Sequence, residues 1–225
     1  MPRKTELSRS RSPLLSWAAV AALALPAFLL GFHRIDSSDI WIHLAAGRHI
    51  VETGSVPERD PFSPPDTAAN WINTQWLADV VLFLLHRVGA SAALVTWAAI
   101  LGGVALVLPC ALAMRRRVVR LWPYLVALLL AMIIAYERFF VRPELVSLLL
   151  LAAATQLLRQ RGPRTRGVVL ALVAVQIAWS NSHAASVLGP ILALLAWLGD
   201  AVDRRLRRAD GAAPPTRLPP ALPFL

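Results

Sequence analysis

The chain is poor in the residues that build disulfide frameworks and charged surfaces. It has one cysteine, Cys110, among 225 residues, which excludes an intrachain disulfide and a cysteine-rich metal site. Charged residues make up only 16% of the chain and hydrophobic residues 57%, above the roughly 45–50% that is usual in soluble domains. An apolar excess of this size does not fit into one globular core, so the composition predicts an integral membrane protein.

The apolar residues gather into runs that predict membrane-spanning helices. The runs cover residues 14–32, 90–113, 121–136, 145–158, 167–179 and 184–198. A helix needs roughly 20 residues to cross the hydrocarbon core, so the first two runs suffice and the others need boundary residues or packing against neighbours. We therefore expect an all-α fold, a polytopic transmembrane helix bundle of about six spans.

The net charge of +10 lies in short basic clusters that flank these runs. The clusters cover residues 3–11, 115–120, 159–166 and 204–208. Clusters of this kind, with no groove-reading module between them, exclude a soluble nucleic-acid binder. If the spans alternate, all four lie on one side, which the positive-inside rule makes cytoplasmic. The expected location is the cell (inner) membrane, multi-pass, with both termini cytoplasmic.

The same pattern divides the chain into three parts. Residues 1–13 form a basic cytoplasmic N-terminus, and residues 14–200 form the transmembrane domain, which contacts membrane lipids and includes an outer loop at 33–89. Residues 201–225 are basic and then rich in proline, which predicts a disordered cytoplasmic tail.

The outer loop predicts two amphipathic helices at the membrane interface. Residues 39–53 are compatible with a helix that lies in the interface, and Gly54 is suited to end it. The prolines between 57 and 65 forbid regular structure. A second amphipathic helix is expected to begin at Trp71 and to end near Gly89.

Asp39 and His43 are the first candidates for chemistry. Four residues apart on a helix, they face the same way and suit a general base with its orienting partner, or two ligands of a divalent metal ion. The simpler interpretation is that Asp39 caps the helix and His43 is an ordinary interfacial side chain. Asp36, close by in the same loop, is a weaker substrate-binding candidate.

Two further outer turns carry charged or polar groups. In the turn at 137–144, Arg138 and Arg142 suit an anionic phosphate, although mutual ion pairs in a solvated hairpin explain the charges as well. In the turn at 179–183, His183 is a candidate for substrate contact. Alternatively, the Asn and Ser residues of that turn satisfy backbone groups only.

Together these stretches resemble a bacterial group of polytopic membrane proteins related to the GT-C glycosyltransferases, the protein O-mannosyltransferase and lipid-A-sugar-transferase type. The motifs are Asp39-x-Trp41-x-His43-Leu44-x-x-Gly47, Gly54-x-x-Pro57-x-x-Asp60-Pro61-Phe62-Ser63, Trp71-x-Asn73-x-Gln75-Trp76-Leu77, Arg142-Pro143 and Trp179-x-Asn181-x-His183. The resemblance covers roughly residues 14–200. Because GT-C proteins usually have more than six spans, it implies that the chain is an N-terminal part.

The resemblance implies a transferase that uses a polyprenyl-phosphate-linked sugar as donor at the outer membrane surface. By analogy, Asp39 would deprotonate the acceptor hydroxyl or help to hold a divalent metal, and Arg142 would pair with the donor phosphate. His43 matches the histidine of the group's motif. The alternative is a non-catalytic membrane protein, either a truncated relic or an assembly partner whose polar loop binds another subunit.

Overall fold

The computed structural model describes residues 13–32, 34–65, 67, 69–115, 121–136, 140–159 and 165–209. These residues form helices, turns and one isolated β-bridge between Arg59 and Asn70, which confirms the all-α fold. The elements are α1 (Pro13–Leu29), α2 (Asp39–Thr53), α3 (Trp76–Arg115), α4 (Leu121–Ala135), α5 (Glu144–Leu158), α6 (Arg166–Ser180), the 3-10 helix η2 (Ala184–Val187) and α7 (Leu188–Ala209).

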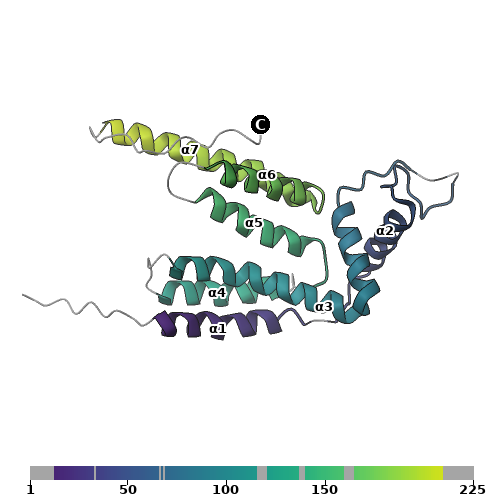
Figure 1. The fold of residues 1–225 in the computed structure, drawn as a ribbon, viewed down its shortest axis with the longest axis horizontal. Coiled ribbons are helices and arrows are strands. Elements are labelled where there is room, and N and C mark those ends of the chain that lie inside the picture. Colours follow the sequence, from purple (N-terminus) through teal and green to yellow (C-terminus); the bar gives the residue numbers. More distant parts are fainter. Residues whose placement is uncertain are drawn as a thin grey trace, which may run out of the picture.

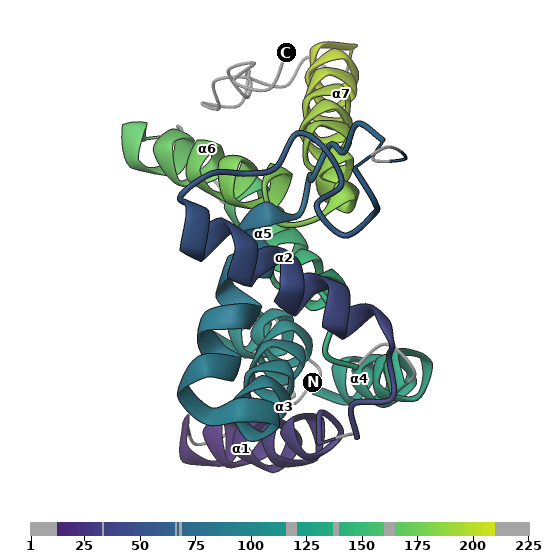
Figure 2. The same cartoon turned by 90° about the vertical axis from the view of Figure 1, so that its right-hand side faces the viewer.

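The helices form an elongated body with a separate cap at one end. In Figure 1, α1, α4 and most of α3 lie below α5, α6 and α7, and the long axes of all six run along the body. The start of α3, α2 and the loop between them stand at the right-hand end. Figure 2, viewed from that end, shows α2 lying across the ends of the other helices. We call α2, the described residues of 54–75, the first turn of α3, residues 140–143 and the turn at 180–183 the polar end.

Two backbone features shape the polar end. Gly54 ends α2 in a left-handed conformation (φ 70°, ψ 14°), and its N–H donates to the carbonyl of Ile50. Glycine tolerates such a conformation because it has no Cβ. In α3, Gly89 and Ala90 leave helical geometry, so the helix breaks into an amphipathic segment at 76–88 and an apolar one from 91 onward. The break turns the first segment across the end of the body.

A buried apolar cluster fixes the cap to the body. It joins α2, both segments of α3 and the start of α5, and comprises Ile40, Leu44, Leu82, Leu94, Ala98, Val141 and Leu145. Full burial of a Leu or Ile side chain is worth roughly 1.5–3 kcal/mol relative to water. Because this cluster packs α2 against α3, it sets the position of the side chains described below.

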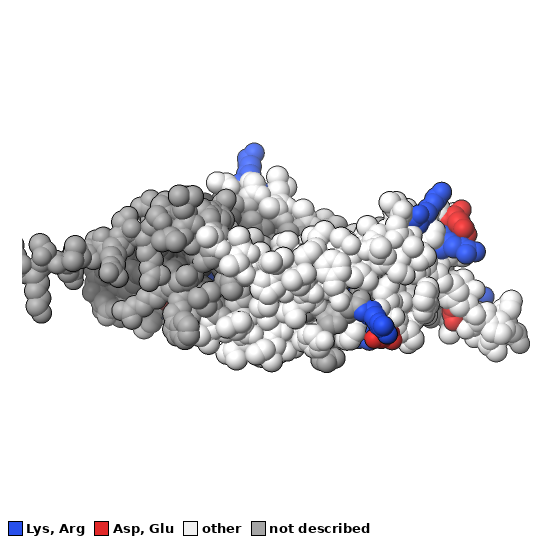
Figure 3. All heavy atoms as spheres, turned by 90° about the horizontal axis from the view of Figure 1, so that it is seen from below, with Lys and Arg blue, Asp and Glu red and all other residues white. Residues whose placement is uncertain are grey.

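The body has long apolar stretches and exposes large apolar side chains. Among the described residues, two stretches are long and apolar enough to cross a membrane by length and composition, Trp76–Pro109 and Ala184–Leu206. α5 and α6 are apolar but have 15 residues each, so the expected six spans are not confirmed. Large apolar side chains are exposed on the body, as at Ile133 and Ile134 of α4. In the view of Figure 3 the described surface of the body is mostly uncharged, and acidic side chains are seen beside basic ones near the polar end.

The helices match the predicted runs with two differences. α3 begins at Trp76, five residues after the predicted start of the second amphipathic helix. α7 continues to Ala209, so residues 201–209 of the predicted disordered tail are helical. Residues 210–225 and 1–12 lie outside the described residues.

Candidate functional site

The site is built where α2 crosses the first turn of α3. Gly47 of α2 makes the crossing close, because a Cβ added there would collide with the backbone carbonyl of Asp79 and lie 2.8 Å from the Cβ of Phe83. One turn earlier on α2, Nδ1 of His43 lies 2.7 Å from Oδ1 of Asp79. The close crossing therefore brings a histidine and a carboxylate from different helices into contact.

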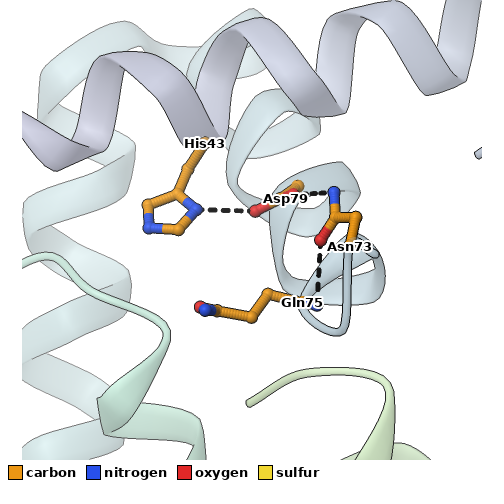
Figure 4. A network of polar contacts seen from close by, with 4 residues as sticks. All are labelled: His43, Asn73, Gln75 and Asp79. Carbon is orange, nitrogen blue, oxygen red and sulfur yellow. Dashed lines mark hydrogen bonds and ion pairs between the residues drawn. The ribbon is translucent and has the colours of Figure 1, made fainter. Parts of the chain in front are cut away.

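Asp79 is a buried charged residue whose two oxygens are both engaged. Its exposed fraction is 2%, and Oδ2 accepts a hydrogen bond of 2.7 Å from Nδ2 of Asn73. Oδ1 takes the contact with His43 already described. Burial of a carboxylate is costly unless it is paired and hydrogen-bonded, and these two partners meet that requirement. Figure 4 shows Asp79 between His43 and Asn73.

Asn73 also explains why α3 starts later than predicted. Its Oδ1 accepts a hydrogen bond of 2.9 Å from the backbone N–H of Gln75, which forms a side-chain turn in place of a helical one. Upstream, the N–H of Trp71 donates to the carbonyl of Glu58 across the loop. Residues 71–75 are thus held as a loop that carries its side chains to the edge of the His43–Asp79 contact.

A small open pocket of about 100 Å³ lies beside this contact. Its walls come from α2, from the loop at 71–75 and from Asp79, and comprise Ile42, His43, Ala46, Trp71, Ile72, Asn73, Thr74, Gln75 and Asp79. Figure 4 shows the second ring nitrogen of His43, Nε2, on the edge of the ring away from Asp79 and on the side where the Gln75 amide lies. We call this feature the His43 pocket.

Asp39 contacts Arg142 and not His43. Nη2 of Arg142 lies 3.4 Å from Oδ2 of Asp39, and Nε of Arg142 donates to Oγ of Ser37 at 3.3 Å. Both ionic side chains are accessible, with exposed fractions of 58% for Asp39 and 36% for Arg142. Ser38 occupies the N-cap position of α2 and Asp39 is in its first turn, so the simple capping role considered for Asp39 is wrong.

His183 is fixed by a second polar cluster. Its Nδ1 accepts from the N–H of Ala185 at 3.2 Å and lies 2.9 Å from Oγ of Ser147. The buried indole N–H of Trp179 donates to that same Oγ at 2.8 Å, which leaves the Ser147 hydroxyl proton for Nδ1. These contacts place the proton of neutral His183 on Nε2.

The environment of His183 favours the neutral form. Burial lowers the pKa of His183 below its usual value of 6.5, the charge of Glu144 raises it, and the charge of His43 lowers it further.

Asn181 joins the last motif to the start of α3. Its Oδ1 accepts from the indole N–H of Trp76 at 2.8 Å, and its backbone carbonyl accepts from the N–H of Leu77 at 2.9 Å. Residues more than 100 positions apart in the sequence are thereby held together. The motif residues of the first loop, of Arg142 and of the turn at 180–183 consequently gather at the polar end.

Of the two remaining predicted site residues, Asp36 alone lies in the part of the chain that the structure describes. Asp36 is exposed in the connection between α1 and α2, and Arg138 lies outside the described residues. Asp79 and Ser147 were not predicted as site residues from the sequence. A signal existed for Asp79, because it is the one acidic residue in the apolar first turns of its helix, but nothing in the sequence identified its partner.

The side chains around Asp39 and His43 do not fit a divalent metal ion. Among the residues that the structure describes, no group of three or more His, Cys, Asp or Glu side chains converges as a metal-binding cluster. Asp39 stands beside the Arg142 guanidinium, and His43 is directed to Asp79. A cation competes poorly at a carboxylate already paired with a fixed positive charge, so we derive no chemical step through a metal.

The geometry can orient an imidazole, hold an accessible guanidinium and carboxylate at the same end of the molecule, and offer a pocket lined by an indole and amides.

Comparisons of the chain with models of protein families, with curated proteins and with solved structures gave no match.

Proposed function

We propose that the chain is a GT-C-like membrane glycosyltransferase, or the N-terminal portion of one, which transfers a sugar from a polyprenyl-phosphate donor at the outer face of the inner membrane. The observation that carries the proposal is the contact between Asp39 and Arg142, which come from separate motifs and meet in an accessible position. The pair stands at the edge of an apolar helical body, where the phosphate of a lipid carrier would lie.

The chemistry of such a transfer matches the groups present. The acceptor hydroxyl loses a proton, its oxygen bonds to C1 of the donor sugar, and the bond from C1 to the phosphate oxygen breaks. Positive charge at the leaving phosphate and a base at the acceptor lower the barrier. Arg142 supplies an accessible guanidinium suited to a phosphate, and Asp39 and His43 supply the two possible bases.

The proposal includes the topology expected from the charges. The helices α1 and α4 to α7, with the apolar segment of α3, form the six-span body, and both termini are cytoplasmic. The exposed apolar side chains of α4 and α6, such as Ile134 and Leu170, support it because these surfaces suit lipid better than water. Trp41, 61% exposed on α2, suits the headgroup layer.

Binding of the lipid phosphate is the direct test. The full chain in lipid nanodiscs would be titrated with farnesyl phosphate, a short polyprenyl phosphate, and separately with farnesol, and tryptophan fluorescence would report binding. We expect saturable binding of farnesyl phosphate and at least tenfold weaker binding of farnesol, because a charge-assisted bond to phosphate contributes roughly 1.5–3 kcal/mol.

Two arginine variants make the test specific. Arg142→Gln is expected to weaken farnesyl phosphate binding about tenfold or more. Arg48→Gln is the matched control, because Arg48 is exposed on α2 and, among the described residues, pairs only with Glu52 one turn away. Equal binding of farnesyl phosphate and farnesol, or equal loss in both variants, would overturn the proposal in favour of a non-catalytic membrane protein or assembly partner.

A further inference from the structure

The contact between His43 and Asp79 fixes which nitrogen of the imidazole can act as a base. A carboxylate only accepts hydrogen bonds, so the Nδ1 that faces Asp79 carries the proton in neutral His43. The lone pair then lies on Nε2. Among the described residues nothing is hydrogen-bonded to Nε2, and His43 lines the pocket with Nε2 on the edge of the ring away from Asp79 (Figure 4).

The imidazole of His43 is held in place by hydrogen bonds around Asp79 and by the close crossing of two helices. Asn73 donates to the second oxygen of Asp79 and is itself held by the Gln75 backbone N–H. The carboxylate cannot rotate away without loss of its contacts with Asn73 and His43. Gly47 keeps α2 in contact with the Asp79 backbone. An imidazole held by a buried carboxylate, with its other nitrogen free, is the arrangement that activates hydroxyl nucleophiles in hydrolases.

The lining of the pocket indicates what kind of hydroxyl it receives. Trp71 offers an indole held edge-on by Phe62 at a centroid distance of 5.6 Å, and the Gln75 amide has both a donor and an acceptor. Ile42 and Ile72 add apolar surface. An aromatic surface with convergent amide and imidazole groups matches a sugar, which has apolar C–H faces and hydroxyl groups at its edge.

We propose that the His43 pocket binds the acceptor substrate as a sugar, and that Nε2 of His43 is the base which removes the proton from its attacking hydroxyl. This proposal rests on the proposed transferase function. In the step, the acceptor O–H bond breaks and its proton passes to Nε2. The acceptor oxygen bonds to C1 of the polyprenyl-phosphate sugar, and the electron pair of the broken C1–O bond leaves on the phosphate.

Asp79 is a positioning residue in this scheme, and Asp39 has a different role from the one implied by the GT-C resemblance. Asp39 lies 3.4 Å from the Arg142 guanidinium, so its carboxylate is already paired with a positive charge and not with an imidazole. It orients Arg142 for the donor phosphate. The acceptor and donor sites are thus on neighbouring parts of the polar end, with His43 in one and Arg142 in the other.

The first experiment measures acceptor binding at His43 without need of turnover. The full chain, labelled with ¹⁵N-histidine in nanodiscs, would be titrated with methyl α-D-mannopyranoside and methyl β-D-glucopyranoside. We expect the His43 Nε2 resonance to shift saturably with at least one glycoside, and the Trp71→Phe variant to weaken that binding severalfold. A His43 resonance that no glycoside moves, in a protein that still binds farnesyl phosphate, would overturn the pocket and leave the proposed function standing.

The second experiment tests the base. His43→Asn keeps a side-chain N–H where Nδ1 donates to Asp79 but has no counterpart of Nε2, so the fold is expected to survive. His49→Gln, on the same helix, is the matched control. With a polyprenyl-phosphate sugar and the bound glycoside, His43→Asn should lose transfer at least 100-fold, within the 10²–10⁴ range of general-base catalysis, while farnesyl phosphate binding is unchanged.

Asp79→Asn should lower kcat with little change in KM and alter the pH profile, and added imidazole should restore part of the transfer in His43→Gly. Transfer at the wild-type rate by His43→Asn, together with its loss in Asp39→Asn, would assign the base to Asp39 and refute this inference. Glycoside binding without any binding of farnesyl phosphate would instead refute the proposed function.

Discussion

The helical body and the polar end are held together by different forces. In the body, apolar side chains such as Leu128 and Met132 pack in the interior while others, such as Ile133 at 73% exposure, face outward. At the polar end, His43, Asn73 and Asp79 form a connected set of hydrogen bonds. In the body, one apolar contact can replace another because apolar packing has no fixed direction. At the polar end, each hydrogen bond needs one particular donor and one particular acceptor. Single substitutions should therefore be most costly at the buried hydrogen bonds of the polar end and least costly at exposed side chains such as Ile133.

The largest change in the free energy of unfolding is expected from Asp79→Leu. It leaves the Nδ1 proton of His43 and the Nδ2 group of Asn73 without their acceptors in a buried position, and loss of one partner from a buried pair costs about 3–5 kcal/mol. The free energy of unfolding in mixed detergent micelles would measure it. Glu52→Leu, at an exposed carboxylate of α2, should change stability by about 0.5 kcal/mol or less. Equal losses in the two variants would mean that the buried network does not stabilise the polar end.

The close crossing of α2 and α3 gives the second prediction. Gly47→Ala forces a methyl group against the Asp79 backbone, and overpacking of this kind costs about 1–3 kcal/mol. Gly199→Ala in α7 is the control, because nothing lies within 4 Å of its added Cβ and alanine is the better helix former. We expect a lower unfolding free energy for Gly47→Ala and an unchanged or higher one for Gly199→Ala. The opposite order would show that the crossing is loose.

Local patterns were sufficient to predict most helices. The predicted helix at 39–53 is confirmed as α2, because its amphipathic pattern and the glycine that ends it are both local. The start of α3 was wrong by five residues because Asn73 captures the Gln75 N–H, a side-chain bond that competes with the helix and leaves no apolar signature. The apolar periodicity of a helix in the sequence indicates which side chains are buried. It does not indicate where a polar side chain ends the helix by a hydrogen bond, which only the folded structure shows.

The site was predicted in part. The sequence identified His43, Asp39, Arg142 and His183 as a set, but the pairing of Asp39 with Arg142 joins residues more than 100 positions apart and no spacing rule could supply it. The sequence predicted His43 and Asp39 as partners because they are four residues apart on one helix. The actual partner of His43 is Asp79, 36 residues away, and the α2–α3 crossing at Gly47 creates that contact.

The third prediction concerns pH and His183. Because burial lowers its folded-state pKa below the usual 6.5, the unfolded chain binds the proton first as the pH falls. This contribution to stability is fully present above pH 6.5 and is lost as the pH falls through the folded-state pKa. Protonation of Nδ1 would also remove the acceptor for Ser147 and Ala185.

The His183→Asn variant sharpens this prediction. Asparagine places an oxygen close to the position of Nδ1, so it can accept the same two hydrogen bonds but does not titrate. Unfolding free energies measured from pH 7.5 to 5 should decline more steeply in the wild type than in His183→Asn. Parallel curves would show that other groups cause the decline and that His183 contributes nothing to it.

The smallest effect on stability is expected at the Asp39–Arg142 pair. A substitution there should change farnesyl phosphate binding much more than the free energy of unfolding. Both side chains are substantially exposed, so solvent screening limits the pair to about 0–1 kcal/mol, and Arg142→Gln should hardly change the unfolding free energy. The same variant should weaken farnesyl phosphate binding about tenfold or more, because a phosphate gains a charge-assisted bond from a guanidinium that is otherwise only loosely paired. Salt should weaken that binding in the wild type more than in the variant. If Arg142→Gln instead destabilised the protein strongly and left farnesyl phosphate binding intact, the pair would be part of the fold's support and the donor phosphate would have to bind elsewhere.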